Sequence, residues 1–110
     1  MKITPILATA IALAVAGPAL VRAQPAAATV TIDNFAFDAQ TVTVAPGATV
    51  TWVNNDDAPH TVVADDGKSF RSKVLDTGEK FSFTFMSAGT FGYFCSIHPH
   101  MTGKVVVKVP

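Results

Sequence analysis

The stretch at residues 91–101 joins an aromatic segment to a loop rich in sulfur and imidazole, and it reads Phe91-Gly92-Tyr93-Phe94-Cys95-Ser96-Ile97-His98-Pro99-His100-Met101. Successive side chains of a β-strand point to opposite faces. A strand over residues 90–95 that buries Phe91 and Tyr93 therefore turns Cys95 inward at its end. The loop that follows adds two histidines and a methionine. The sequence thus predicts a cluster of metal-binding side chains at one end of a β-structure.

The same two-residue period recurs along much of the chain. Phe81, Phe83 and Phe85 alternate with polar residues, and further inward-facing sets are predicted at Val30/Ile32, Val42/Val44, Val50/Trp52 and Val105/Val107/Val109. Turn signals separate these segments at residues 45–47, 65–67, 76–78 and 87–89. Many short, half-buried strands without an amphipathic helical stretch favour an antiparallel sandwich or barrel. We therefore expect an all-β fold, a two-sheet Greek-key β-sandwich or barrel of about seven or eight strands.

The first 23 residues have the pattern of a secretory signal peptide. Lys2 gives a positive start, residues 6–21 are almost wholly apolar, and Ala23 follows as a small residue at a cleavage site. A transmembrane anchor is the competing interpretation, but Gly17-Pro18 interrupts a run shorter than the roughly 20 residues that span a bilayer. We expect a signal peptide at 1–23, a short linker at 24–28, one domain at 29–110, and a periplasmic mature protein that leaves the membrane after cleavage.

Charge and cysteine content narrow the function classes. The chain has 8 basic and 8 acidic residues, and loss of Lys2 and Arg22 leaves a slight acidic excess, so neither nucleic acid nor an anionic membrane is an expected partner. The single cysteine is unusual for a secreted protein, because a lone thiol in an oxidising compartment is open to oxidation or intermolecular pairing. Metal ligation of Cys95 removes that liability. A buried, inert cysteine is the alternative when Cys95 is considered by itself.

Four residues form a candidate metal site: His60, Cys95, His98 and Met101. Soft sulfur ligands with imidazole select Cu(I), Zn²⁺ or iron–sulfur clusters, and two His with one Cys and a weak axial Met is the blue-copper arrangement. Such a set needs a second histidine, and outside the loop the sequence offers one, His60. His60 shares strand parity with Val62, so it should also face the interior and meet Cys95.

These motifs resemble those of the cupredoxins, most closely the amicyanins and plastocyanin-like proteins. The resemblance rests on an N-x5-H segment ending at His60 and on the C-x2-H-x2-M loop from Cys95 to Met101, and it covers about residues 29–109. It implies the Greek-key sandwich and one type 1 copper ion. In such proteins the Asn ties the two ligand-bearing loops together, and the next residue places a backbone N–H near the Cys sulfur. The resemblance therefore implies these roles for Asn54 and Asn55.

The resemblance also implies a function. It predicts a periplasmic monomer that carries single electrons by Cu(II)/Cu(I) cycling between redox proteins, such as a c-type cytochrome or a periplasmic dehydrogenase. No ligand position is left for a substrate, whereas a catalytic metal normally keeps one site open, so we do not expect an enzyme. A copper-binding or copper-delivery protein without electron transfer would use the same residues. A thiol enzyme built on Cys95 and a Cys/His zinc site are weaker alternatives.

Other conspicuous side chains are given ordinary structural roles. Trp52 and the stripe of Phe81, Phe83 and Phe85 are interpreted as core, not as a redox relay. Met86 is interpreted as a packing residue beside a turn, and His100 as a solvated loop residue.

Overall fold

The computed structural model describes residue 2 and residues 24–110, and apart from Lys2 the expected signal peptide lies outside these described residues. Residues 24–110 form eight strands and no helix. In chain order the strands are β1 (Ala27–Asp33), β2 (Ala36–Asp38), β3 (Thr41–Val44), β4 (Ala48–Asn54), β5 (Val63–Ala64), β6 (Lys80–Phe85), β7 (Gly89–Phe94) and β8 (Thr102–Val107). The expected all-β fold of seven or eight strands is confirmed.

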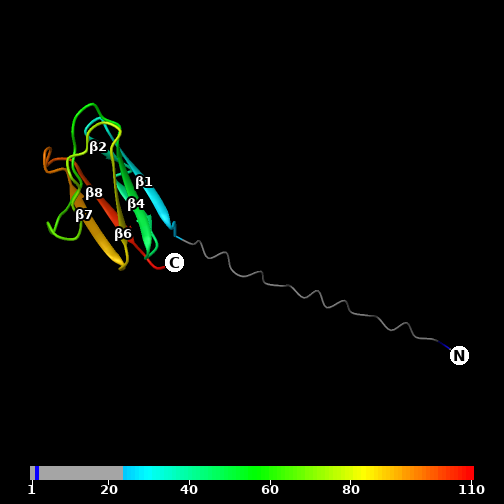
Figure 1. The fold of residues 1–110 in the computed structure, drawn as a ribbon. Coiled ribbons are helices and arrows are strands. Elements are labelled where there is room, and N and C mark those ends of the chain that lie inside the picture. Colours follow the sequence, from blue (N-terminus) through cyan, green and yellow to red (C-terminus); the bar gives the residue numbers. More distant parts are fainter. Residues whose placement is uncertain (1, 3–23) are drawn as a thin grey trace.

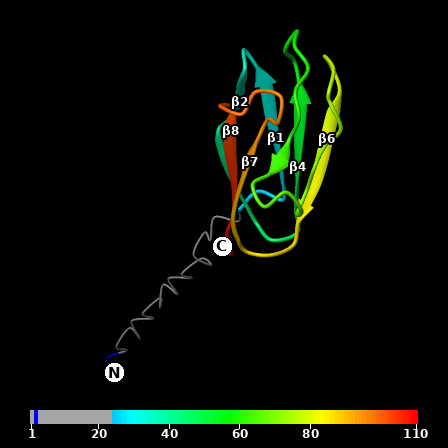
Figure 2. The same ribbon diagram turned by 90° about the vertical axis from the view of Figure 1, so that its left-hand side faces the viewer.

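The strands form two packed sheets, with orders β2-β1-β4-β6 and β3-β8-β7-β5, and Figures 1 and 2 show the two layers. β1 pairs with β4, and β3 with β8, in parallel, whereas the other pairs are antiparallel. The antiparallel pairing favoured from the sequence is therefore found in four of the six strand pairs, and it was wrong for the two parallel pairs. The parallel pairs arise because the chain crosses between sheets before and after β3 instead of returning through hairpins.

The core lies between the sheets and follows the predicted alternation. Of β6, Phe85 is buried and Phe81 and Phe83 are half-buried, while the intervening residues are exposed. Trp52 is fully buried and its ring lies 5.3 Å from Tyr93 and 5.9 Å from Phe70, between centroids. Aromatic rings of both sheets thus fill the interior, and Trp52 has the predicted core role.

The strand boundaries at the two ends of the domain differ from those expected. β1 begins at Ala27, so the last two residues of the expected linker are part of a strand. β8 ends at Val107, and Val109, predicted to face inward, is 64% exposed because it extends past the end of the sheet. In the part of the chain described, no helix is long and apolar enough to cross a membrane.

Three connections lie at one end of the sandwich, opposite the C-terminus. They are the β1–β2 turn, the loop after β4 and the loop after β7, and Figure 2 shows them together at the top, in blue-green, green and orange. β1, β4 and β7 all run toward this end. The fold therefore gathers segments from both sheets around the histidine- and cysteine-bearing loops.

Candidate metal centre

His60 is held by the backbone of a neighbouring segment. It forms an isolated antiparallel bridge with Leu75, in which the His60 N–H donates to the Leu75 carbonyl (3.1 Å) and the Leu75 N–H donates to the His60 carbonyl (2.7 Å). Both side chains are fully buried. The inward orientation predicted from its shared parity with Val62, which is also buried, is confirmed.

Cys95 stands directly after β7 and faces the core as predicted. Phe91 is half-buried, while Tyr93 and Cys95 are buried. The loop that follows is closed by two backbone hydrogen bonds, from the Cys95 N–H to the Met101 carbonyl (3.0 Å) and from the Met101 N–H to the His98 carbonyl (2.9 Å). The seven-residue segment therefore turns back over the end of the sandwich and returns directly into β8.

The fold brings His60, Cys95 and His98 into one cluster. The Cys95 Sγ lies 3.8 Å from Nδ1 of His60 and 3.7 Å from Nδ1 of His98, and the three candidate ligand atoms all lie within 4.8 Å of one another. A metal bound with zinc-like lengths, about 2.0–2.1 Å to nitrogen and about 2.3 Å to sulfur, separates the two atoms by about 3.8 Å when the angle between the bonds is about 120°. The spacing fits a trigonal His₂Cys site.

Met101 and His100 of the same loop lie in different environments. Met101 is 5% exposed and belongs to the hydrophobic core cluster that also contains Cys95. His100 is exposed, in agreement with the solvated role expected for it, and is not part of the three-residue cluster. Met86, in contrast to Met101, is 72% exposed, so its interpretation as a packing residue was wrong.

The environment of Cys95 favours the thiolate. Burial alone raises the pKa of the thiol, but the Thr61 N–H, His60 and His98 stabilise the anion and together lower the pKa to about 6. The Thr61 N–H donates to Sγ over 3.3 Å. Because the thiolate is the form that binds metals, Cys95 is prepared for ligation near neutral pH.

The sequence family follows from comparison with known proteins. Residues 25–108 match the model of the copper binding proteins of the plastocyanin/azurin family. The chain belongs to this family and is a cupredoxin. Family and donor set together assign it one type 1 copper ion as cofactor.

Individual relatives support the assignment. This cupredoxin is 37% identical over 102 residues to amicyanin-alpha of Methylorubrum extorquens, covering 88% of this chain and 86% of that protein. It is 36% identical over 86 residues to amicyanin of Paracoccus versutus, covering 74% of this chain and 65% of that protein. Among solved structures it resembles a purple cupredoxin from Nitrosopumilus maritimus, with a TM-score of 0.70 and 31% identity over 74% of this chain and 99% of the other.

Thr61, which we did not predict, joins the two site-bearing loops of this cupredoxin. Its hydroxyl lies 2.7 Å from the Ser96 hydroxyl and accepts from the Ser96 N–H over 2.8 Å.

The roles implied for Asn54 and Asn55 were wrong. The Asn54 amide donates to the carbonyls of Ala58 and Leu75, away from the Cys95 loop.

Asn55 is equally remote from the sulfur. Its N–H donates to the Ile32 carbonyl, whereas the N–H at Cys95 belongs to Thr61. The position of Thr61 directly after His60 was the one sequence signal that pointed to it. The contact between its side chain and Ser96 could not be predicted, because it depends on how the two sheets pack.

Asp56 and Phe35 were also missed. The Asp56 carboxylate accepts hydrogen bonds from His60 Nε2 (2.8 Å) and from the Phe35 N–H (3.0 Å). The Phe35 N–H, and next the His60 imidazole, hold the pKa of Asp56 below its ordinary value. A carboxylate only accepts, so Nε2 of a neutral His60 carries the proton and Nδ1 keeps its lone pair toward Cys95.

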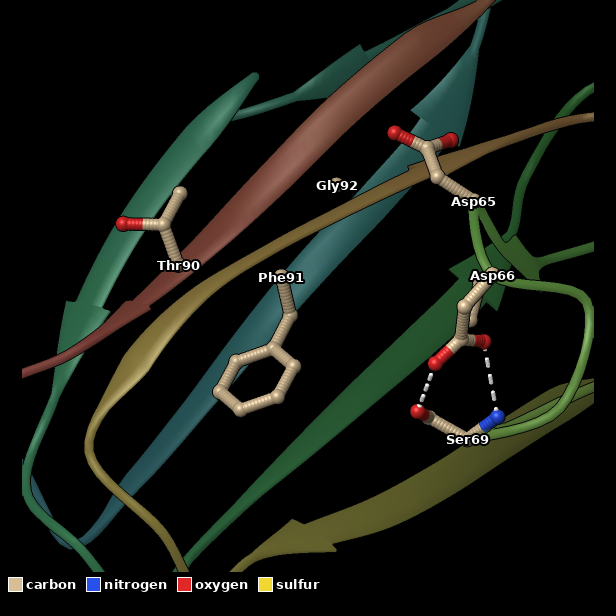
Figure 3. Close-up of a pocket in the computed structure, with 7 residues that line it drawn as sticks. Asp65, Asp66, Ser69, Thr90, Phe91 and Gly92 are labelled. Carbon is tan, nitrogen blue, oxygen red and sulfur yellow. Dashed lines mark hydrogen bonds between the residues drawn. The ribbon is translucent and has the colours of Figure 1, made fainter.

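A separate hollow lies between the loop after β5 and β7, shown in Figure 3, where the Asp65 side chain lies over Gly92. Beside it the Asp66 carboxylate accepts from both the N–H and the hydroxyl of Ser69, and these bonds lower its pKa to about 2. The hydrogen bonds serve the turn itself. None of the residues lining this hollow belongs to the metal centre.

Proposed function

We propose that this cupredoxin is a periplasmic electron carrier and not an enzyme, cycling copper between Cu(II) and Cu(I) with His60, Cys95 and His98 as ligands and Met101 as the weak axial ligand. The observation that carries the proposal is the cluster of buried His60 and Cys95 with half-buried His98, in which Cys95 Sγ lies 3.8 and 3.7 Å from the two Nδ1 atoms. This is the donor set and spacing of a His₂Cys electron-transfer site.

The residues around the cluster act as a rigid frame. Reciprocal backbone bonds to Leu75 hold His60, and backbone bonds between Cys95 and Met101 close the other loop. Bound copper supplies the one-electron chemistry. A frame that keeps its ligands in one arrangement in both oxidation states reduces the movement needed when the electron is transferred.

His98 is the route by which the electron leaves. Its side chain is half-buried, whereas His60 is fully buried. Uncharged residues flank it in the same loop and the neighbouring loop, namely Ala58, Pro59, Ile97 and Pro99. A patch without charges lets a partner approach without desolvating ions. Redox partners typically bury less than about 1,200 Å² in total, so we propose transient docking of a monomer here, with a c-type cytochrome or a periplasmic dehydrogenase.

Copper delivery is the competing function. A delivery protein has to release its metal, and the depth of the Cys95 and His60 side chains in a hydrogen-bonded frame favours retention. The rates of electron exchange and of copper transfer distinguish the two functions. A carrier exchanges electrons with a small c-type cytochrome much faster than it passes copper to a chelator, and the reverse order would favour delivery.

The primary experiment is the visible spectrum and redox titration of the copper-loaded mature protein. We expect an intense blue thiolate-to-copper band and a reversible one-electron titration. Cys95→Ser should abolish the band, because a hydroxyl lacks the soft thiolate donor. A Ser variant with the wild-type spectrum would show that Cys95 does not bind the metal.

A further inference from the structure

Asp56 connects three segments at the metal-binding end of the sandwich. Its Oδ2 accepts from His60 Nε2 and from the Phe35 N–H, while its Oδ1 accepts from the Asp57 N–H (2.9 Å). Its backbone carbonyl accepts from the Thr77 hydroxyl over 2.6 Å. The residue is only 9% exposed. A single carboxylate oxygen thus joins the imidazole of a proposed copper ligand to the β1–β2 turn.

Phe35 occupies that turn in an unusual conformation. Asn34 and Phe35 both have positive φ, 48° and 55°, between the paired residues Asp33 and Ala36. Two-residue hairpin turns with positive φ at both positions favour Asn followed by Gly. A bulky residue at positive φ is a genuine outlier. Phe35 therefore stands where the turn itself favours glycine.

The Phe35 ring contacts both histidines instead of the core. It lies edge-on to His60 (centroids 5.5 Å apart, planes at 82°) and to His98 (5.1 Å, 83°), and the residue is 52% exposed. A side chain this exposed contributes little to the hydrophobic core. An unfavourable backbone conformation at an exposed turn position suggests a functional constraint. The ring contacts of Phe35 indicate that this constraint is to cover the two imidazoles.

We propose that Asp56 and Phe35 together tune the copper site, Asp56 as a positioning residue for His60 and Phe35 as a cover over His60 and His98 that Asp56 holds in place. The inference rests on the proposed function insofar as these histidines bind copper. Carboxylates that accept from a ligating histidine fix its tautomer and raise its basicity, and the apolar surroundings of a metal control solvent access and reduction potential.

The two residues should shift the reduction potential in opposite directions. The Asp56 charge makes His60 a better donor and favours Cu(II), so Asp56→Asn should raise the potential. The Phe35 ring excludes water from a site that is more charged in the Cu(II) state, so Phe35→Gly should lower it. A purely structural role would not predict opposite signs.

The experiment measures potential, copper affinity and the His60 tautomer in four variants. Asp56→Asn should weaken copper binding about tenfold or more, in a chelator competition, and ¹⁵N NMR of the copper-free protein should show loss of the uniform Nε2–H tautomer. Asp57→Asn is the matched control, because it removes the same charge from an exposed neighbour, whereas the hydrogen bond and ion pair of His60 are made with Asp56. It should leave affinity and tautomer unchanged.

For Phe35 the matched control is Asn34→Gly. Both glycine variants relax the same turn, but only Phe35→Gly removes the ring, so only that variant should lower the potential while both keep or gain thermal stability. Wild-type values of potential and tautomer in Asp56→Asn, or equal shifts in Phe35→Gly and Asn34→Gly, would overturn the inference while leaving the blue band intact. Failure of the proposed function looks different, because the wild-type protein would then lack the thiolate band altogether.

Discussion

The backbone N–H of Thr61 donates a hydrogen bond to the Sγ of Cys95 over 3.3 Å, so the residue that follows one proposed ligand stabilises the thiolate of another. The Thr61 hydroxyl at the same time binds Ser96, next to that cysteine. One threonine therefore couples the two loops of the metal centre through both its backbone and its side chain.

We predict that Thr61→Val destabilises the protein by about 1–3 kcal/mol, because it removes the hydroxyl and leaves partly buried polar groups of Ser96 without this partner. Urea unfolding of the copper-free protein measures the change. Thr49→Val is the control, since it breaks the exposed hydroxyl pair of Thr49 and Thr84 and should cost little. Equal losses in the two variants would contradict the coupling role.

Met101→Leu should keep copper bound and raise its reduction potential. The buried side chain is replaced by an apolar one of similar size, so packing is largely preserved. A weak axial sulfur favours the oxidised ion slightly, and its loss favours Cu(I). Redox titration and the visible spectrum test this. If both were unchanged, Met101 would be a core residue and not a ligand.

Ala58→Glu should slow electron exchange with a small c-type cytochrome by about tenfold without changing the copper spectrum. A charge in the uncharged patch beside His98 has to be desolvated when a partner docks. Ala88→Glu provides the control, because this exposed residue lies in the β6–β7 connection at the opposite end of the sandwich. Stopped-flow rates of electron exchange, measured for both variants at matched driving force, test this prediction. Equal slowing by both variants would move docking away from His98.

Two glycines of the central strands should differ in their tolerance of alanine. A Cβ at Gly103 would collide with the hydroxyl end of Tyr93, whose buried ring is packed against Phe37 and Trp52. Overpacking of this kind typically costs about 1–3 kcal/mol. A Cβ at Gly92 would meet only the carboxylate of exposed Asp65, which can swing away.

Thermal unfolding should therefore show a clearly lower Tm for Gly103→Ala than for Gly92→Ala. The reverse order would mean that the Asp65 loop is more rigid than the Tyr93 ring.

Acid should destabilise the turn at Asp66. The folded-state pKa is about 2 against an ordinary value of 3.8, chiefly through the bonds from Ser69. Because the folded pKa is lowered, the carboxylate stabilises the fold above about pH 4. That stabilisation is lost as the pH falls toward 2. Ser69→Ala should reduce this pH dependence, measured by chemical unfolding between pH 5 and 2, and an unchanged slope would rule out the Ser69 contribution.

Sequence patterns that span a few residues were sufficient to predict many of the strands and the inward direction of Cys95 and His60. The alternation at Phe81, Phe83 and Phe85 identified a half-buried strand, and parity along β7 turned Cys95 inward, since pleating ties side-chain direction to position. The inward orientation of His60 followed from the same rule. The parallel pairings escaped prediction because alternation is the same in parallel and antiparallel strands when one face is buried.

The sequence by itself determined the strand-rich class, the donor types and the short Cys95–Met101 loop, because these depend on chemistry and spacing within a few residues. Tertiary structure alone decided which groups support the donors. Thr61 reaches Ser96 across 35 positions, and Asp56 reaches the Phe35 N–H across 21. Such contacts depend on how the two sheets pack and how far each loop extends, and no local periodicity encodes either. The positive φ of Phe35 also requires the tertiary structure for its explanation, because only the folded chain places the Phe35 ring beside the two histidines.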